Sequence, residues 1–458
     1  MKFRSTLILA LLLVVGVFTV YFLDYKPGAE REVEEFLDKK FITLEIDSII
    51  EIDIISPEVK ISLIRSENKW LITDPVKVKA NQNQINDLIW NVSQTKKGRK
   101  VSNSSNLKVF GLDPSKISLT FRFKDGHETG YSIGDESPTG EFLFAKRRNN
   151  SDIFTVPKEF FTQSNKKLFD LRAKYILSLR SNEIHKLSVK TKSFEYDINW
   201  DAENRRYIMS TPATLPIETG KMNAYFSRIS NARAAEFIDS EQPSNSITGL
   251  GDGETSIKLL ASDPPRQEIL MIGNVVIRNG KAYRYVRDAS RPAIMLIDSS
   301  LAEYLERDPF EIIQKELMIF EKVKVDEIVL KYGDINIQIN KKNNNWDLTS
   351  PDNLIADDSK VSELLDNILS LKATAVENYK PKNVNKYGIS PKNFFLSISE
   401  SGKVMNSIQT GKSVGNELYV QSSKSTAIFR VSSTSLDKLK IQKNYFEKKE
   451  ITELEETQ

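Results

Sequence analysis

The segment Asn344–Pro351 reads NNWDLTSP, and two other segments of the chain repeat its pattern. These are NKWLITDP at Asn68–Pro75 and RRYIMSTP at Arg205–Pro212. In each segment a large aromatic residue is followed five positions later by proline, and apolar side chains recur between them, which is typical of a strand that ends at a turn. The three aromatic residues are Trp70, Tyr207 and Trp346, and they lie 137 and 139 positions apart. Because this period is long, it predicts tandem domains.

An amphipathic helix is predicted at the same distance after each aromatic residue. Fifteen positions on, apolar side chains begin to recur at i, i+3, i+4 and i+7, the spacing that places them on one helical face. The three stripes are Ile85, Leu88, Ile89 and Val92; Met222, Tyr225, Phe226 and Ile229; and Val361, Leu364, Leu365 and Ile368. N-caps are predicted at Asn83, at Thr219 and at Asp358 or Ser359. Such stripes could bind a partner, but packing against a sheet of the same domain is the commoner use, and we expect it here.

Two sets of glycines keep the same register. The first set, Gly111, Gly249 and Gly388, lies 41, 42 and 42 positions after the aromatic residues, in segments typical of turns. The second set, Gly134, Gly273 and Gly411, follows 23, 24 and 23 positions later, after alternating segments that predict β-hairpins. Each unit should therefore contain two or three strands, a helix and about four further strands. The short connections favour an antiparallel sheet with the helix on one face.

The predicted fold class is α+β, with an N-terminal transmembrane helix followed by three tandem repeats. Each repeat is expected to be a mostly antiparallel sheet with one packed amphipathic helix, and the second repeat is the divergent one. The predicted boundaries are a cytoplasmic stub and anchor at 1–24, a linker at 25–47, repeat domains at 48–178, 179–320 and 321–446, and a charged tail at 447–458.

The first residues predict the compartment. Lys2 and Arg4 precede an uncharged run, Ser5–Leu23, which as a helix nearly spans a hydrocarbon layer of roughly 30 Å. A cleaved signal peptide is the alternative, but no small residues mark a cleavage site after the run. We expect a single-pass anchor in a bacterial inner membrane. By the positive-inside rule the N-terminus is then cytoplasmic and residues 25–458 are periplasmic.

Composition removes several classes of function. The chain of 458 residues has 65 lysines and arginines against 62 acidic residues, a net charge of +3, so nothing favours a nucleic-acid partner. It has no cysteine, which excludes disulfides and thiolate chemistry, and only two histidines, His127 and His185. No cofactor or metal ion is predicted.

The order of these landmarks, after one N-terminal anchor, resembles a bacterial family called domain of unknown function 4340. The matching residues are Trp70, Pro75, Gly111, Pro114 and Gly134, and then Trp346, Pro351, Gly388, Pro391 and Gly411. The second repeat departs from the pattern, with Tyr207 for tryptophan and no proline after Gly249. Proteins of this family are commonly encoded beside ABC-transporter components of the gliding-motility type. The resemblance thus implies an accessory envelope protein, and the family has no assigned catalytic residues.

Several motifs mimic functional sites. Thr410–Ser413 (TGKS) resembles the end of a phosphate-binding loop, but position 406 is Asn406 where that loop needs glycine, so a turn is predicted. Gly249–Gly253 lacks the alternating ligands of a calcium loop. His127 is interpreted as an exposed turn residue, Asp357–Asp358 as helix caps, and Lys146–Arg148 as a basic loop that could touch lipid or a partner. No residue is assigned to a catalytic, cofactor-binding or metal site.

Three functions stay open at this stage. The leading hypothesis is a non-catalytic, membrane-anchored periplasmic scaffold that docks on an ABC-transporter-type complex such as its permease. A carrier or bridge for lipid or another apolar ligand is the alternative, and it predicts a continuous exposed apolar strip. A glycan-acting enzyme ranks third, because it would need two converging carboxylates that a sequence cannot place.

Overall fold

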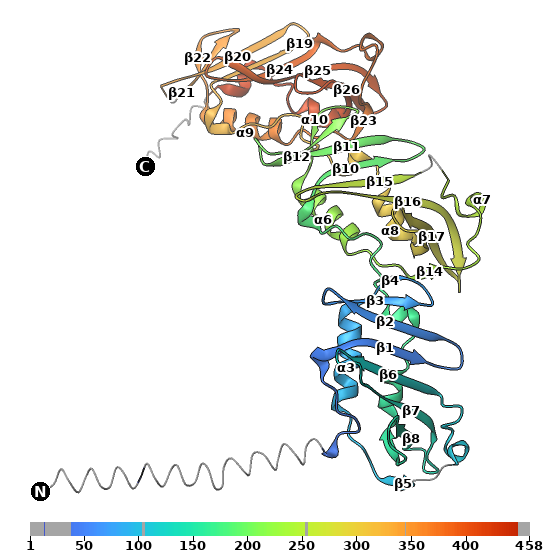
Figure 1. Cartoon of the computed structure of the whole chain (residues 1–458). Helices are drawn as coiled ribbons and strands as arrows, with labels where there is room; N and C mark the ends of the chain where they lie inside the picture. Colours follow the sequence, from blue (N-terminus) through green and yellow to red (C-terminus); the bar gives the residue numbers. More distant parts are fainter. Residues whose placement is uncertain (1–12, 14–37, 103–105, 252–254, 344, 448–458) are drawn as a thin grey trace, which may run out of the picture. The chain divides into compact units, whose positions relative to one another are not determined.

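The computed structural model describes residues 13, 38–102, 106–251, 255–343 and 345–447 (Figure 1). They form three nine-stranded antiparallel sheets that follow one another along the chain, which confirms the predicted tandem α+β repeat. The chain divides into two compact units, Met1–Lys174 with the first sheet and Tyr175–Gln458 with the other two.

The first sheet has the strand order β4-β3-β2-β1-β6-β7-β8-β9-β5, and all its neighbours are antiparallel. Its helix α3 (Gln82–Gln94) connects the two edge strands β4 and β5. The strands are β1 (Ile49–Ile55), β2 (Lys60–Ser66), β3 (Lys69–Asp74), β4 (Val78–Lys79), β5 (Lys100–Ser102), β6 (Ile117–Phe123), β7 (Glu128–Glu136), β8 (Phe142–Arg147) and β9 (Ile153–Pro157). Short helices α4 (Lys158–Ser164) and α5 (Leu168–Leu171) follow.

The second sheet repeats this order as β13-β12-β11-β10-β15-β16-β17-β18-β14. Its strands are β10 (Ile184–Lys190), β11 (Glu195–Asp201), β12 (Arg206–Thr211), β13 (Leu215–Pro216), β14 (Glu236–Ile238), β15 (Ser256–Ser262), β16 (Pro265–Arg278), β17 (Lys281–Asp288) and β18 (Ile294–Asp298). Its helices are α6 (Thr219–Ser230), α7 (Asn245–Thr248) and α8 (Ser299–Leu305).

The third sheet has the order β22-β21-β20-β19-β24-β25-β26-β27-β23. Its strands are β19 (Glu327–Tyr332), β20 (Ile335–Lys342), β21 (Asn345–Ser350), β22 (Leu354–Ile355), β23 (Ala375–Asn378), β24 (Ser390–Glu400), β25 (Lys403–Val414), β26 (Glu417–Ser422) and β27 (Ile428–Ser432). Its helices are α9 (Asp358–Leu369) and α10 (Ser433–Asp437).

Each predicted helix stripe is buried in full, because α3, α6 and α9 cover one face of their own sheet. Trp70 and Trp346 are buried on that face, and the half-buried ring of Tyr207 contacts Phe226 of α6, with centroids 5.4 Å apart. The expectation that the stripes pack within their own domains is confirmed. All three predicted N-caps are displaced by one or two positions: Asn81, Glu218 and Asp357 hold the N-cap positions of α3, α6 and α9.

The prolines of the opening motif end strands β3, β12 and β21. The peptide bonds before Pro75, Pro212 and Pro351 are all cis. The chain then makes a short turn and returns as an edge strand of only two residues, β4, β13 or β22. These edge strands and their counterparts β5, β14 and β23 were not among the expected strands. Very short edge strands leave little unpaired backbone for association with other sheets.

The two glycine sets lie against each other. Gly111, Gly249 and Gly388 adopt positive φ angles of 62°, 67° and 67° in the turn that precedes β6, β15 or β24. A Cβ atom on Gly134 would lie 2.1 Å from the carbonyl oxygen of Phe110, and one on Gly411 would lie 2.2 Å from that of Tyr387. The second glycine of each repeat therefore leaves room for the turn formed by the first.

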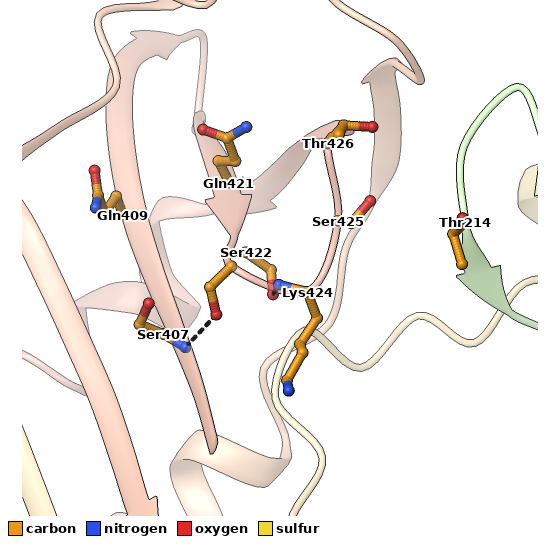
Figure 2. A pocket seen from close by; sticks show the side chains of 9 residues that line it. Thr214, Ser407, Gln409, Gln421, Ser422, Lys424, Ser425 and Thr426 are labelled. Carbon is orange, nitrogen blue, oxygen red and sulfur yellow. Dashed lines mark hydrogen bonds between the residues drawn. The ribbon is translucent and has the colours of Figure 1, made fainter. Parts of the chain in front are cut away.

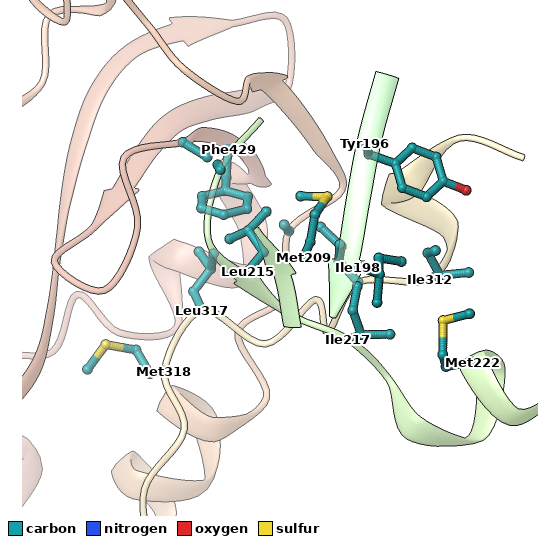
Figure 3. Packing of buried hydrophobic residues seen from close by; sticks show 14 of the residues in the cluster. Tyr196, Ile198, Met209, Leu215, Ile217, Met222, Ile312, Leu317, Met318 and Phe429 are labelled. Carbon is teal, nitrogen blue, oxygen red and sulfur yellow. The ribbon is translucent and has the colours of Figure 1, made fainter. Parts of the chain in front are cut away.

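The second and third sheets share one hydrophobic core within their compact unit. Figure 3 shows side chains of both sheets in this cluster, including Met209 and Leu215 of the second and Phe429 of the third. The connecting segment pairs first with the second domain, through an Ile217–Ile313 bridge, and then with the third, through a Glu316–Lys372 bridge. These two domains are thus joined by backbone pairing as well as by apolar packing.

The predicted membrane anchor, residues 5–23, lies outside the described residues except for Leu13. Within the part of the chain that the structure describes, no helix is long and apolar enough to span a membrane.

Candidate functional site

The open face of each sheet, which points away from α3, α6 or α9, is the candidate functional surface. Strand alternation decides its composition: Ile52 and Ile54 of β1 are buried toward the helix, so Glu51 and Asp53 point the other way. The covered faces of the three sheets are all apolar. Their open faces differ in chemistry.

An ordered network of charges lies on the open face of the first sheet. Arg122 of β6 is hydrogen bonded to Glu51 of β1, and its Nη2 lies 2.9 Å from Glu128 Oε1 of β7. The far carboxylate oxygen of Glu128 is 3.3 Å from Arg148, which also donates a 3.0 Å bond to Thr120 Oγ1. Hydrogen bonding by Glu128 and the charge of Glu51 raise the pKa of Arg122. Residues from three strands and from the turn after β8 are thus held in one array.

The matched position on the third sheet has a different partner. Glu327 stands opposite Ser399 as Glu51 stands opposite Arg122, because both pairs belong to the contact between the first and sixth strands of their repeat. Glu327 accepts 2.8 Å and 2.7 Å hydrogen bonds from Ser399 Oγ and Gln338 Nε2. An ion pair in the first sheet is thus replaced by neutral hydrogen bonds in the third.

A groove of about 520 Å³ opens on the third sheet (Figure 2). Its floor includes Gln409 of β25 and Gln421 of β26, which stand directly opposite each other. Its full lining is Thr214, Ser407, Gln409, Gln421, Ser422, Ser423, Lys424, Ser425 and Thr426. No carboxylate is among these residues, so the groove offers hydroxyl and amide hydrogen bonds and one cation. Thr214 comes from the second domain, and a bound group would therefore contact two domains.

The wall of this groove is held by hydrogen bonds. Ser422 and Ser423 both donate to Asn406 Oδ1, at 2.9 Å and 3.1 Å. The amide of Ser407 donates to Ser423 Oγ at 3.0 Å, the bond drawn in Figure 2. Because Asn406 also donates 2.9 Å from its Nδ2 to the Leu317 carbonyl, the wall is tied to the segment that joins the two domains.

The second sheet presents an open face with side chains of both charges. Lys186 occupies the position that Glu51 and Glu327 hold in the other two sheets. The charged side chains on this face include the cations Lys186, Lys190, Lys258 and Arg287 and the acids Glu195 and Asp197, with Glu195 directly opposite Lys190. One fold thus displays three different polar surfaces.

The two histidines lie in different compact units of the chain, and each has local surroundings of its own. His127 follows the β6–β7 turn, where its ring stacks on Phe123 with centroids 4.2 Å apart and its Nδ1 is 2.6 Å from Asp125 Oδ1. Hydrogen bonds from the backbone and ring of His127 lower the pKa of Asp125. His185 lies in β10, and its buried Nδ1 has no hydrogen-bond partner within the described chain. Neither histidine joins a larger polar cluster.

The remaining motifs have structural surroundings. Thr410–Ser413 lies inside β25 at a bulge, so the predicted turn is wrong; the Lys412 side chain packs over Gly388. Gly249 ends α7 in the left-handed conformation, while Asp252–Gly253 lie outside the described residues. Lys146–Arg148 is not a free loop either, since β8 continues to Arg147 and Arg147 lies over the Phe154 ring at 5.1 Å.

Buried titratable groups serve the core. Tyr131 is buried in the first domain, where its hydroxyl is 2.7 Å from Ser164 Oγ, and burial strongly raises its pKa. Tyr225 in α6 donates 2.8 Å to the Leu305 carbonyl, and burial raises its pKa as well. Among the described side chains, no group of three or more histidine, aspartate and glutamate residues could hold a metal ion.

These features define a tandem-repeat protein whose sheet-and-helix domains share one strand order and carry dissimilar polar faces. A family model described as Domain of unknown function (DUF4340) matches residues 70–250, 241–347 and 346–458, and the chain belongs to this family. Two of the three matches begin at Trp70 and Trp346, the residues that mark the repeat. No curated protein and no solved structure shows a significant match to the chain.

Proposed function

We propose that this chain is a non-catalytic scaffold of the bacterial cell envelope. Residues 5–23 would hold it in the inner membrane, with residues 25–458 in the periplasm, and the open faces of its sheets would dock on an ABC-transporter-type membrane complex. The single observation that carries the proposal is the divergence of the open faces on three copies of one domain.

Divergence of this kind suits recognition of different polar surfaces. The Glu51–Arg122–Glu128–Arg148 array is held on a rigid sheet, so a partner need not order it at a cost in entropy. Complementary charge would give specificity and speed of association more than affinity. The groove at Gln409 and Gln421 adds neutral donors and acceptors for a second contact.

The other two functions rank lower on these surfaces. A carrier for lipid needs a continuous exposed apolar strip, whereas the first sheet presents charges and the third presents mainly serine and amide side chains. A glycan-acting enzyme needs two carboxylates about 5 to 10 Å apart and free to act on a substrate. The lining of the groove includes no carboxylate, and Glu51 and Glu128 on the first sheet are both bound to Arg122.

Site-specific photo-crosslinking in intact cells tests the proposal. A photoreactive amino acid replaces Thr120 or Gln421 on the open faces, and the matched control replaces Glu363, which is exposed on α9 of the third domain. We expect the open-face positions to capture a membrane protein of the transporter class and the helix position to capture none. Equal capture at all three positions would contradict docking through open faces, and capture of lipid alone would favour the carrier.

A further inference from the structure

The hairpin of β16 and β17 in the second domain extends beyond its neighbouring strands. Pairing between β15 and β16 ends at Ser256 and Met271, and pairing between β17 and β18 ends at Tyr283 and Asp298. Residues 275–282, the overhang, pair only with residues of the same hairpin in the described chain, around an Asn279–Gly280 turn with positive φ at both residues.

The equivalent hairpins of the other two domains have no such extension. In the first domain Phe142, beside the β7–β8 turn, is paired with Pro157 of β9. In the third domain Glu417, at the β25–β26 turn, is paired with Ser432 of β27. The overhang is thus an addition to the second domain and not a requirement of the fold.

The overhang carries exposed aliphatic side chains on a rigid support. Val275 and Ile277 are 56% and 61% exposed, and Ile247 of α7, 59% exposed, is tied to the hairpin base by a 3.0 Å bond from Asn274 Nδ2 to its carbonyl. On the opposite side of the hairpin, Val276 and Tyr283 pack against the small core of Leu250, Tyr285, Ile294 and Leu296. Large aliphatic groups are therefore presented to solvent by a well-packed element.

The only charged side chains within the overhang are cations. Arg278 and Lys281 flank the turn, and residues 275–282 include no carboxylate. Lys281 also forms a 2.6 Å ion pair with Asp298 at the hairpin base, which lowers the pKa of Asp298 to about 2. Exposed aliphatic groups next to basic residues are the combination that enters the interface of an anionic membrane.

We propose that the β16–β17 overhang inserts Val275 and Ile277 into the headgroup region of a membrane containing anionic lipid, with Arg278 and Lys281 at the phosphates. A lipid surface fits better than a protein partner, because a specific protein interface buries roughly 1,200–2,000 Å², far more than three aliphatic side chains supply. A contact between lipid and a few aliphatic side chains is weak by itself, so stable binding needs a second attachment to the membrane. The proposal does not rest on the scaffold function, since it involves neither the open faces nor a partner complex.

Fluorescent labelling of the full chain tests this proposal. The protein has no cysteine, so Ile277→Cys provides a unique site for an environment-sensitive dye, with Thr139→Cys and Asn416→Cys as matched controls at the turns of the other domains. In vesicles of equal parts phosphatidylcholine and phosphatidylglycerol carrying a doxyl quencher, we expect quenching and a blue shift at position 277 only. Quenching at 277 no greater than at 139 and 416 overturns the proposal.

Two further measurements separate lipid from protein. Adding Arg278→Gln to the labelled variant should weaken the contact about five-fold, the effect of one basic group near an anionic surface, without changing the melting temperature. If dye at position 277 changes only in vesicles that also contain native membrane proteins, the occupant is a protein and the lipid proposal is wrong.

Discussion

The first and third sheets have the same covered face and different open faces. On the covered side, Trp70 and Trp346 are buried at matched positions, and their carbonyls accept hydrogen bonds from the amides of Ala80 and Ala356, each two residues before the helix begins. On the open side, the position of Arg122 in the first sheet is taken by Ser399 in the third. Packing against a helix constrains one side of a strand, while the other side is free to acquire the chemistry of a binding surface.

This comparison separates the residues that maintain the domain from the residues that can vary with function. The mutations below break the covered face or sharpen the contrast between open faces. They run from the largest expected effect to the smallest.

Replacing Trp346 with alanine breaks the covered face of the third sheet. Removing a buried tryptophan leaves a cavity beneath α9, and we expect the unit to lose about 3–5 kcal/mol of stability. Gln421→Ala on the open face of the same sheet is the control, and its effect should stay within about 0.5 kcal/mol. Differential scanning calorimetry of both variants measures the difference. Similar losses in the two variants would contradict the division between faces.

Replacing Gly411 with alanine tests the packing of the two glycine sets. The new Cβ would lie 2.2 Å from the Tyr387 carbonyl oxygen, so the turn must move, and we expect a loss of about 1–3 kcal/mol. Gly220→Ala in α6 is the control, because nothing lies within 4 Å of its Cβ position and alanine favours a helix. Urea denaturation should show destabilisation for the first variant and none for the second.

Matched glutamate-to-glutamine changes sharpen the contrast between open faces. Glu51→Gln removes the ion pair with Arg122, an exposed contact that contributes little to stability, and its effect should shrink as salt screens the pair. Glu327→Gln alters bonds to neutral Ser399 and Gln338, so its effect should not depend on salt. Urea titrations at low and high sodium chloride measure both. An equal salt dependence would show that the two networks are electrostatically alike.

The smallest expected effect is a pH dependence at Asp298. Hydrogen bonding to Lys281, with bonds from Ser300, lowers the pKa of Asp298 to about 2, below its unfolded value near 3.8. Because the pKa is lower in the folded state than in the unfolded state, the ionised carboxylate stabilises the fold at pH values above about 3.8. This stabilisation is lost as the pH falls toward 2. Asp298→Asn retains a helix-capping side chain for α8 but removes the charge. We expect the melting temperature of this variant to change less between pH 4 and pH 2 than that of the unsubstituted protein. The same pH dependence in both proteins would contradict the ion pair.

Much of the fold was predictable because its signals are local. The stripes of α3, α6 and α9 and the glycine turns follow from spacings within a few residues of one another, and the structure confirms them. The N-caps at Asn81 and Glu218 were missed because the helices begin before their apolar periodicity does. Strand β23 was missed because its pairing is with β27, about fifty positions further along the chain, so propensity over four residues says little.

The candidate surfaces were beyond sequence-based prediction for a different reason. Polar residues at alternate strand positions indicate an open face, but they do not say which of them will meet. Glu51 reaches Arg122 because β1 lies beside β6, and the groove takes Thr214 from one domain and Gln421 from the next. The family match likewise shows the repeat without assigning a residue to a function.

The sequence by itself determined the number of domains, the helix in each and the face that it covers, because hydrophobic periodicity is a property of neighbouring residues. The tertiary structure alone decided which polar groups share a surface, how the second and third cores merge, and that one hairpin extends past its sheet. Those features depend on strand order and register, which arise from contacts between distant segments of the chain.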